Sequence, residues 1–251
     1  MSDAMDIAVR LRALTPARVG LGRTGVSQQT RDLLAFQRAH ALARDAVHAR
    51  LNATALAGSL DEITGGTTIQ LHSAAFDRRA YLERPDLGRR LDEPSRAALV
   101  ERCRDRHESW DLALTVADGL SALAVERHAA PLLKHLLPRI ESWRVAPICA
   151  VEQGRVAVGD EIGRLLGAQL ALVLIGERPG LSAPDSLGAY ITWKPEPGRT
   201  DAERNCVSNV RGEGLSYPAA AAQIAYYLTE ARRRQITGVA LKDASRRLEE
   251  G

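Results

Sequence analysis

An unbroken apolar run in the second half of the chain constrains its fold most. Residues 171–180 read ALVLIGERPG: six apolar or small residues, of which the last, Gly176, already begins the turn sequence GERPG. Such a run, bounded by turn residues, predicts a strand buried on both faces, as in a parallel sheet. Ligands bind beyond the carboxyl ends of the strands in sheets of this kind. Glu177 and Arg178 are therefore either placed to contact a ligand or simply solvated in a polar turn.

Strand and helix patterns alternate from residue 111 onward. Short apolar runs predict strands at 112–117, 145–151, 170–175, 189–193 and 205–210. Helical spacing predicts helices at 121–137, 160–166 and 218–234, the second of them closed by Gly167. This alternation predicts an α/β domain over residues 96–251, with a Rossmann-like, mostly parallel sheet and helices on both faces.

The first 95 residues do not show this alternation of strand and helix patterns, which predicts a helical and irregular subdomain. Apolar residues at helical spacing predict a helix over 28–51, and a helical pattern resumes over 93–106. The charge-dense segment 81–90 contains Pro85 and Gly88, which favour a structured loop over a long helix. Residues 5–14 give only a poor amphipathic helix pattern.

Turns that follow parallel strands meet at one edge of the sheet, which we call the rim. The rim is expected to gather four groups of residues: Asp118-Gly119, Arg155-Val156, Gly176-Glu177-Arg178 and Cys206-Val207-Ser208-Asn209. These residues combine both charge signs, hydroxyl and amide groups, and glycines that allow a close backbone approach. The rim therefore suits a large polar ligand, with helix N-termini available for a phosphate.

Composition excludes several classes of function. Apolar residues make up 45% of the 251 residues, enough for a core, whereas aromatic residues make up 4%, too few for a surface that stacks single-stranded nucleic acid. The net charge of +3 is mild, and no apolar run approaches the ~18 residues of a membrane span. We therefore expect neither a nucleic-acid nor a membrane partner. Three distant cysteines and the lack of a signal-like N-terminus predict a reduced, cytoplasmic protein.

Metal and dinucleotide sites find little support in the sequence. There is no HExxH or CxxC pattern, and His128 and His135 share only a possible helix face, so no metal ligand is expected. Residues 20–25, GLGRTG, match the dinucleotide pattern GxGxxG. However, Pro16 interrupts the segment where a strand should precede it. The acid nearest to the expected position about 20 residues on, Asp45, lies in a predicted helix. A basic loop that docks on another surface is the favoured interpretation.

Five segments occur in an order that identifies a family. They are PARVGLGRTG at 16–25, RPDLGRR at 84–90, ADGLS at 117–121, GERPG at 176–180 and RNCVSN at 204–209. Together they closely resemble the small (light) subunit of ethanolamine ammonia-lyase, and the resemblance runs from about residue 14 to about residue 241.

The resemblance implies a subunit of a lyase that uses adenosylcobalamin to convert ethanolamine to acetaldehyde and ammonia by a radical mechanism. In that family a large subunit, a TIM barrel, holds the substrate, and the small subunit closes on the cobalamin from the other side. The chain would therefore work in a hetero-oligomer and supply no catalytic residue. The radical chemistry belongs to the cofactor, whereas the protein supplies position and shielding.

The resemblance also assigns cofactor contacts to this chain. Val156 would pack against the corrin or its nucleotide tail, and Glu177 would accept hydrogen bonds from corrin amides or the ribose. Cys206 would touch the cofactor as a small soft side chain. Arg178 and Ser208 are further candidates, although a salt bridge that fixes the loop explains Arg178 equally well. No Asp-x-His-x-x-Gly motif is present, so the cofactor's dimethylbenzimidazole is expected to stay on the cobalt and this chain to provide no cobalt ligand.

The sequence leaves alternatives open for the cellular location and the function of the protein. Members of the family carry a longer N-terminal extension associated with a bacterial microcompartment, whereas about a dozen residues precede the first family motif here. A free cytoplasmic enzyme is therefore expected rather than an encapsulated one. Two other functions remain possible at this stage: a corrinoid-binding or assembly module without a lyase role, and a nucleotide-binding oxidoreductase built on residues 20–25.

Overall fold

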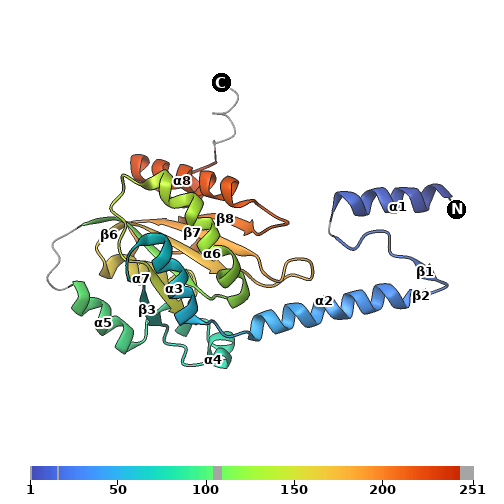
Figure 1. Ribbon diagram of the computed structural model, residues 1–251, viewed down its shortest axis with the longest axis horizontal. Helices are drawn as coiled ribbons and strands as arrows, with labels where there is room; N and C mark the ends of the chain where they lie inside the picture. The colour runs from blue at the N-terminus through green and yellow to red at the C-terminus, as the bar shows by residue number, and fades with distance from the viewer. Residues whose placement is uncertain (1, 16, 104–108, 244–251) are drawn as a thin grey trace, which may run out of the picture.

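The computed structural model describes residues 2–15, 17–103 and 109–243. Within these residues, a six-stranded sheet with the order β3-β5-β4-β6-β7-β8 forms the centre of the molecule (Figure 1). The strands are β3 (Ile69–His72), β4 (Trp110–Ala117), β5 (Cys149–Glu152), β6 (Ala168–Gly176), β7 (Leu187–Trp193) and β8 (Arg204–Val210). Residues 170–176 of β6 are buried, as the apolar run predicts. The α/β fold with a mostly parallel sheet is therefore confirmed.

The sheet differs from the prediction in the direction of two strands, in one additional strand and in the length of another. The strands β3, β5, β4 and β6 are parallel, whereas β7 runs antiparallel to β6 and β8 runs antiparallel to β7. No helix lies between β6 and β7 that could carry the chain back for a parallel pairing, so the chain turns directly. The strand β3 was not predicted. The predicted strand 145–151 is regular only from Cys149, since Val145 makes an isolated bridge with Leu112.

Helices cover the two faces of the sheet unequally. On one face, α3 (Ala53–Thr64), α6 (Ala122–Leu136) and α8 (Tyr217–Arg234) enclose the larger core together with β6, β7 and β8. On the other face, α5 (Glu93–Cys103) and α7 (Val158–Leu165) pack on β3, β4 and β6. Cys206 and Ser208 of β8 are exposed on this second face. The outer part of the sheet is thus left as an open shelf beside the carboxyl ends of β4 and β6.

The predicted helices form with small changes at their ends. Ser121 caps α6 by accepting a hydrogen bond from the backbone N–H of Ala124, and Gly167 follows α7 with φ 69°. The predicted helix 93–106 is seen as α5 to Cys103, and residues 104–106 lie outside the described residues. The predicted loop 81–90 instead begins with the end of α4 (Arg78–Glu83), because Asp77 caps that helix through the N–H of Ala80. Short 3-10 turns lie at Leu87–Arg89, Leu137–Ile140, Asp201–Glu203 and Gly238–Ala240.

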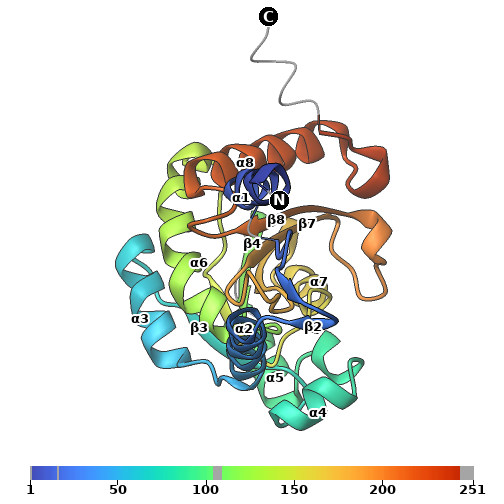
Figure 2. The ribbon, with the colours of Figure 1, turned by 90° about the vertical axis from the view of Figure 1, so that its right-hand side faces the viewer.

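The N-terminal segment forms an arm that projects from the body. It consists of α1 (Ser2–Leu14), the short strands β1 (Arg23–Thr24) and β2 (Ser27–Gln28), and α2 (Thr30–His48), and it extends beyond the rim end of the sheet (Figures 1 and 2). Residues 20–25 lie in this arm and include β1 of the β1–β2 hairpin, so they do not lie between a strand of the central sheet and its helix. This placement removes the context that a dinucleotide site needs. Among the described residues, no helix has the length and apolar character to cross a membrane.

Candidate functional site

A cavity of about 490 Å³ opens at the rim. Its walls come from the turns after β4, β5 and β6, from α4 and the following turn, and from the β7–β8 hairpin. The lining residues are Tyr81, Arg89, Gly119, Leu120, Arg155, Val156, Ala157, Ile175, Gly176, Glu177, Arg178, Tyr190 and Asp201. Three of the five predicted site residues, Val156, Glu177 and Arg178, thus line one cavity, while Cys206 and Ser208 lie on β8 next to it.

Glu177 is held at the mouth of the cavity by its neighbours. Its carboxylate oxygen Oε2 accepts hydrogen bonds from the Ser186 hydroxyl at 2.5 Å and from the backbone N–H of Asn209 at 3.3 Å. The side chain lies over Gly188, where a Cβ atom would approach Oε1 to 2.9 Å. A carboxylate has lone pairs beyond the two used here, so Glu177 retains acceptor capacity on a half-buried, oriented side chain.

Cys206 lies on the open shelf, directly opposite Tyr190 in the β7–β8 register. The Tyr190 hydroxyl interacts with the thiol by a hydrogen bond. Neighbouring protein atoms around the sulfur raise the pKa of the Cys206 thiol, the Tyr190 hydrogen bond lowers it less, and the Glu177 carboxylate adds to the rise. The thiol is therefore protonated at neutral pH, which suits a contact residue and not a nucleophile.

The remaining predicted residues differ in how firmly they are fixed. Val156 is half-buried in the turn before α7 and packs against the core on that face of the sheet. Arg178 is exposed, and no carboxylate of the described residues lies within 4.0 Å of it. The alternative that Arg178 forms a salt bridge fixing the loop therefore finds no support in the described part of the chain. Ser208 is exposed on the shelf, on the same side of β8 as Cys206.

Two glycines allow the turns beneath the cavity to touch through their backbones. The N–H of Leu120 donates to the carbonyl of Gly176 at 2.9 Å. A Cβ atom on Gly176 would lie 2.1 Å from the Ser121 carbonyl oxygen, and one on Gly119 would lie 2.3 Å from the Gly176 carbonyl oxygen. Such distances leave no room for a side chain at either position. The close contact between the β4 and β6 turns thus depends on both glycines.

Asp118 lies under the cavity floor and is only 1% exposed. Its carboxylate accepts a hydrogen bond from the Gly154 N–H at 3.1 Å and lies 3.7 Å from the Arg78 guanidinium. Burial raises the pKa of Asp118 to about 6, against the opposing effects of backbone hydrogen bonds and Arg78. The carboxyl group therefore joins the turns after β4 and β5 and titrates close to physiological pH.

We expect this raised pKa to make stability fall as the pH rises through the range 4–6. The folded state binds the Asp118 proton more tightly than the unfolded chain, so the stabilisation is complete below pH 4 and lost above pH 6. A rise from 3.8 to about 6 corresponds to about 3 kcal/mol. Urea unfolding of wild type and Asp118→Asn at pH 4 and 7 measures it, because the difference between the two proteins should change by that amount. A constant difference would show that Asp118 titrates normally.

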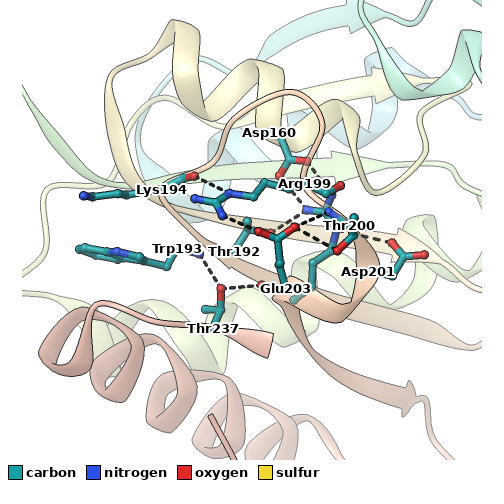
Figure 3. Close-up of polar contacts among 10 residues, drawn as sticks. Asp160, Thr192, Trp193, Lys194, Arg199, Thr200, Asp201, Glu203 and Thr237 are labelled. Atoms are coloured by element: carbon teal, nitrogen blue, oxygen red, sulfur yellow. Dashed lines mark hydrogen bonds and ion pairs between the residues drawn. The ribbon is translucent and has the colours of Figure 1, made fainter. Parts of the chain in front are cut away.

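A polar network fixes the connection between β7 and β8 beside the cavity (Figure 3). The guanidinium of Arg204 on β8 binds both oxygens of Asp160 on α7, at 2.7 and 2.6 Å, and also donates to the Thr192 hydroxyl at 2.8 Å. Thr200 and Glu203 form a capping box at the 3-10 turn Asp201–Glu203. The network holds Asp201 at the cavity wall, with its carboxylate 3.6 Å from Arg204 Nε.

The sequence did not single out three residues that line the cavity. Tyr81 is brought in by α4, Tyr190 by the antiparallel strand β7, and Asp201 by the turn before β8. Tyr190 carries a detectable signal, since residues 188, 190 and 192 alternate to the face opposite the larger core. No group of three or more possible metal ligands is found among the described residues.

Comparison with known proteins places this arrangement in a family. Residues 5–242 match the family model described as ethanolamine ammonia-lyase light chain (EutC). An ethanolamine ammonia-lyase small subunit from Ralstonia nicotianae is 58% identical over 237 residues, which cover 94% of this chain and 87% of that protein. Small subunits from Pseudomonas aeruginosa and Xanthomonas campestris pv. campestris are 57% and 54% identical, covering 93% and 96% of this chain and 86% and 89% of theirs.

The family match covers nearly the whole chain, including the rim, the cavity and most of the arm. The relatives share more than half of their residues with it over that length. Such proteins are named as components of an ammonia-lyase, which is a carbon–nitrogen lyase. The chain belongs to the ethanolamine ammonia-lyase light-chain family.

Proposed function

We propose that this chain is the small subunit of an ethanolamine ammonia-lyase and binds adenosylcobalamin together with a large subunit. The observation that carries the proposal is the meeting of Val156 and Glu177 at one rim cavity, with Cys206 on the adjoining shelf. Glu177 and Cys206 lie in two of the segments that resemble the family, 176–180 and 204–209. The position also follows the general rule for ligands at the carboxyl ends of parallel strands.

The shape of the site fits part of a corrinoid. A cavity of about 490 Å³ is far smaller than adenosylcobalamin, so it can take one edge or the tail of the molecule. The adjacent shelf, where Cys206 and Ser208 are exposed and Tyr190 is half-buried, provides a surface for a broad, flat ligand. A ligand seated here is left uncovered on its other side, which requires a second protein surface.

The residues of this chain would bind and orient the cofactor rather than carry out the reaction. When bound, adenosylcobalamin supplies the radical chemistry that begins with homolysis of its cobalt–carbon bond. Glu177 would accept hydrogen bonds from amide or hydroxyl groups, and Val156 and Cys206 would exclude water from the contact. Because Glu177 is held by Ser186 and Asn209, its position does not have to be fixed at the time of binding.

The arm is proposed as a docking element for the large subunit, expected to be a TIM barrel in a hetero-oligomer. Its exposed apolar side chains include Val9, Leu14, Leu34 and Leu42, all more than 45% exposed. Residues 1–50 also contain eight arginines and four aspartates, a net charge of +4, whereas the whole chain carries +3. An acidic partner surface with apolar patches would cover such an arm. Residues 1–95 would then bind the partner, and residues 96–251 the cobalamin.

The location of the protein is proposed to be the cytoplasm. None of Cys103, Cys149 and Cys206 forms a disulfide in the described part of the chain, and Cys149 is buried. Burial raises the pKa of the Cys149 thiol to about 12, with a smaller contribution from Cys103. These features suit a reducing compartment.

Replacing Glu177 should weaken cobalamin binding in the assembled enzyme. We expect Glu177→Ala to raise the dissociation constant about tenfold or more, because hydrogen bonds to charged groups contribute ~1.5–3 kcal/mol. Equilibrium dialysis of cyanocobalamin against the complex of both subunits measures this. The control is Glu196→Ala, which removes an exposed carboxylate that pairs with Arg164 away from the cavity. An affinity equal to that of wild type in Glu177→Ala would remove Glu177 from the site.

A further inference from the structure

The guanidinium group of Arg155 lies in a fixed position at the cavity wall. Some of its hydrogen-bond donors have no acceptor in the described part of the chain. Its guanidinium carbon lies 4.4 Å from the centre of the Tyr81 ring, and Nη2 donates to the Tyr81 carbonyl at 2.9 Å. Its backbone N–H donates to the Gly88 carbonyl at 2.7 Å. The nitrogen Nε is buried without a hydrogen-bond partner, and Nη1 has none among the described residues. The side chain is thus oriented, with Nε buried and unpaired and Nη1 left without a protein acceptor in the described part of the chain.

The charge of Arg155 is also uncompensated. Within the described residues, no carboxylate lies within 4.0 Å of it. The neighbouring Arg78, whose guanidinium carbon lies 4.6 Å from the same Tyr81 ring, has Asp118 as its counter-ion. The Tyr81 phenol supplies no negative charge, because burial raises its pKa to about 12. A half-buried arginine without a counter-ion, facing a cavity, is typical of a site that binds an anionic group.

We infer that Arg155 binds the phosphate of the ligand that occupies this cavity. The inference rests on the proposed function in naming that ligand, since the nucleotide tail of cobalamin carries a phosphodiester. Phosphate oxygens match the planar donor arrangement of a guanidinium and neutralise its charge. The carboxamide groups around the corrin ring also offer acceptor oxygens, but they are neutral and would leave the charge uncompensated. The donors without an acceptor and the charge without a counter-ion therefore both favour the phosphate.

Comparing the binding of two corrinoids distinguishes the phosphate from the carboxamides as the group that Arg155 binds. Cyanocobalamin carries the phosphate, whereas dicyanocobinamide keeps the corrin carboxamides and lacks the nucleotide tail. Both are measured by equilibrium dialysis against the complex of this chain with its large subunit, using visible absorption. We expect Arg155→Met to weaken cyanocobalamin at least tenfold and to change dicyanocobinamide less than twofold. Arg155→Lys should weaken cyanocobalamin less, because it retains the charge and loses only the planar geometry.

The control is Arg79→Met, which removes a positive charge from an exposed residue of α4 that pairs with Glu83 and does not line the cavity. It should weaken cyanocobalamin less than twofold, which separates a specific contact from a general loss of positive charge. Equal weakening of both corrinoids by Arg155→Met would overturn the phosphate assignment in favour of a carboxamide. No change with either corrinoid would overturn the site. Failure of the wild-type complex to bind any corrinoid would instead overturn the proposed function.

Discussion

Replacing Arg204 by methionine should lower the free energy of unfolding by about 3–5 kcal/mol, because it leaves the Asp160 carboxylate buried without its partner. The two side chains are each 1% exposed and are joined by two hydrogen bonds. The guanidinium also binds the Thr192 hydroxyl and the Arg199 carbonyl, so its loss releases the β7–β8 connection from α7. Urea unfolding of the purified chain measures the change.

Two further variants test this explanation. Arg199→Met removes an arginine that is one-third exposed and pairs with Glu203, so it should cost no more than about 1 kcal/mol. The double variant Asp160→Leu/Arg204→Met should recover much of the stability lost by Arg204→Met, because no buried charge is then left unpaired. A loss of less than about 1 kcal/mol in Arg204→Met alone would contradict the role given to the pair.

The second large effect is expected for Gly176→Ala. Its Cβ atom would lie 2.1 Å from the Ser121 carbonyl oxygen and 2.5 Å from that of Asp118, and both atoms belong to the backbone. The turns after β4 and β6 would have to separate, which should cost about 3 kcal/mol, at the upper end of ordinary overpacking. Because Glu177 follows directly, cyanocobalamin binding by the assembled enzyme should weaken as well.

Gly180→Ala provides a matched control on the same loop. Its Cβ atom would meet the nearest atoms of Ala183 at 3.8–3.9 Å, which is ordinary van der Waals contact. Thermal and urea unfolding should therefore place it within about 0.5 kcal/mol of wild type. Equal stability of Gly176→Ala and Gly180→Ala would show that the contact between the two turns is not needed.

The central sheet could be predicted because burial on both faces leaves a continuous apolar sequence. The run in β6 is such a case, and the five predicted strands all appear. The strand β3 was missed because Ile69–His72 lies at the sheet edge, where Gln70 is exposed and the apolar run is broken. The reversal of β7 was missed because an apolar run carries no sign of direction. Only the short connection from β6 indicates it.

The candidate site was likewise predicted only in part from the sequence. Turns at the ends of β4, β5 and β6 could be placed together because parallel strands end at one edge, and Val156 and Glu177 do line one cavity. Tyr81 and Asp201 could not be found this way, since they reach the cavity through α4 and the capped turn before β8. The apolar spacing predicted a helix over 28–51, and its Leu34 and Leu42 are exposed. Periodicity shows an apolar face but not what covers it.

The measurement that tests the account most directly is acetaldehyde release from ethanolamine in the presence of adenosylcobalamin. Three samples are compared: this chain alone, the large subunit from the same organism alone, and the two together. We predict turnover only in the mixture, because under the proposed function the rim would cover one side of the cofactor and the partner would hold the substrate. A mixture that forms a complex but releases no acetaldehyde would contradict the lyase role and favour a corrinoid-binding module with another partner reaction.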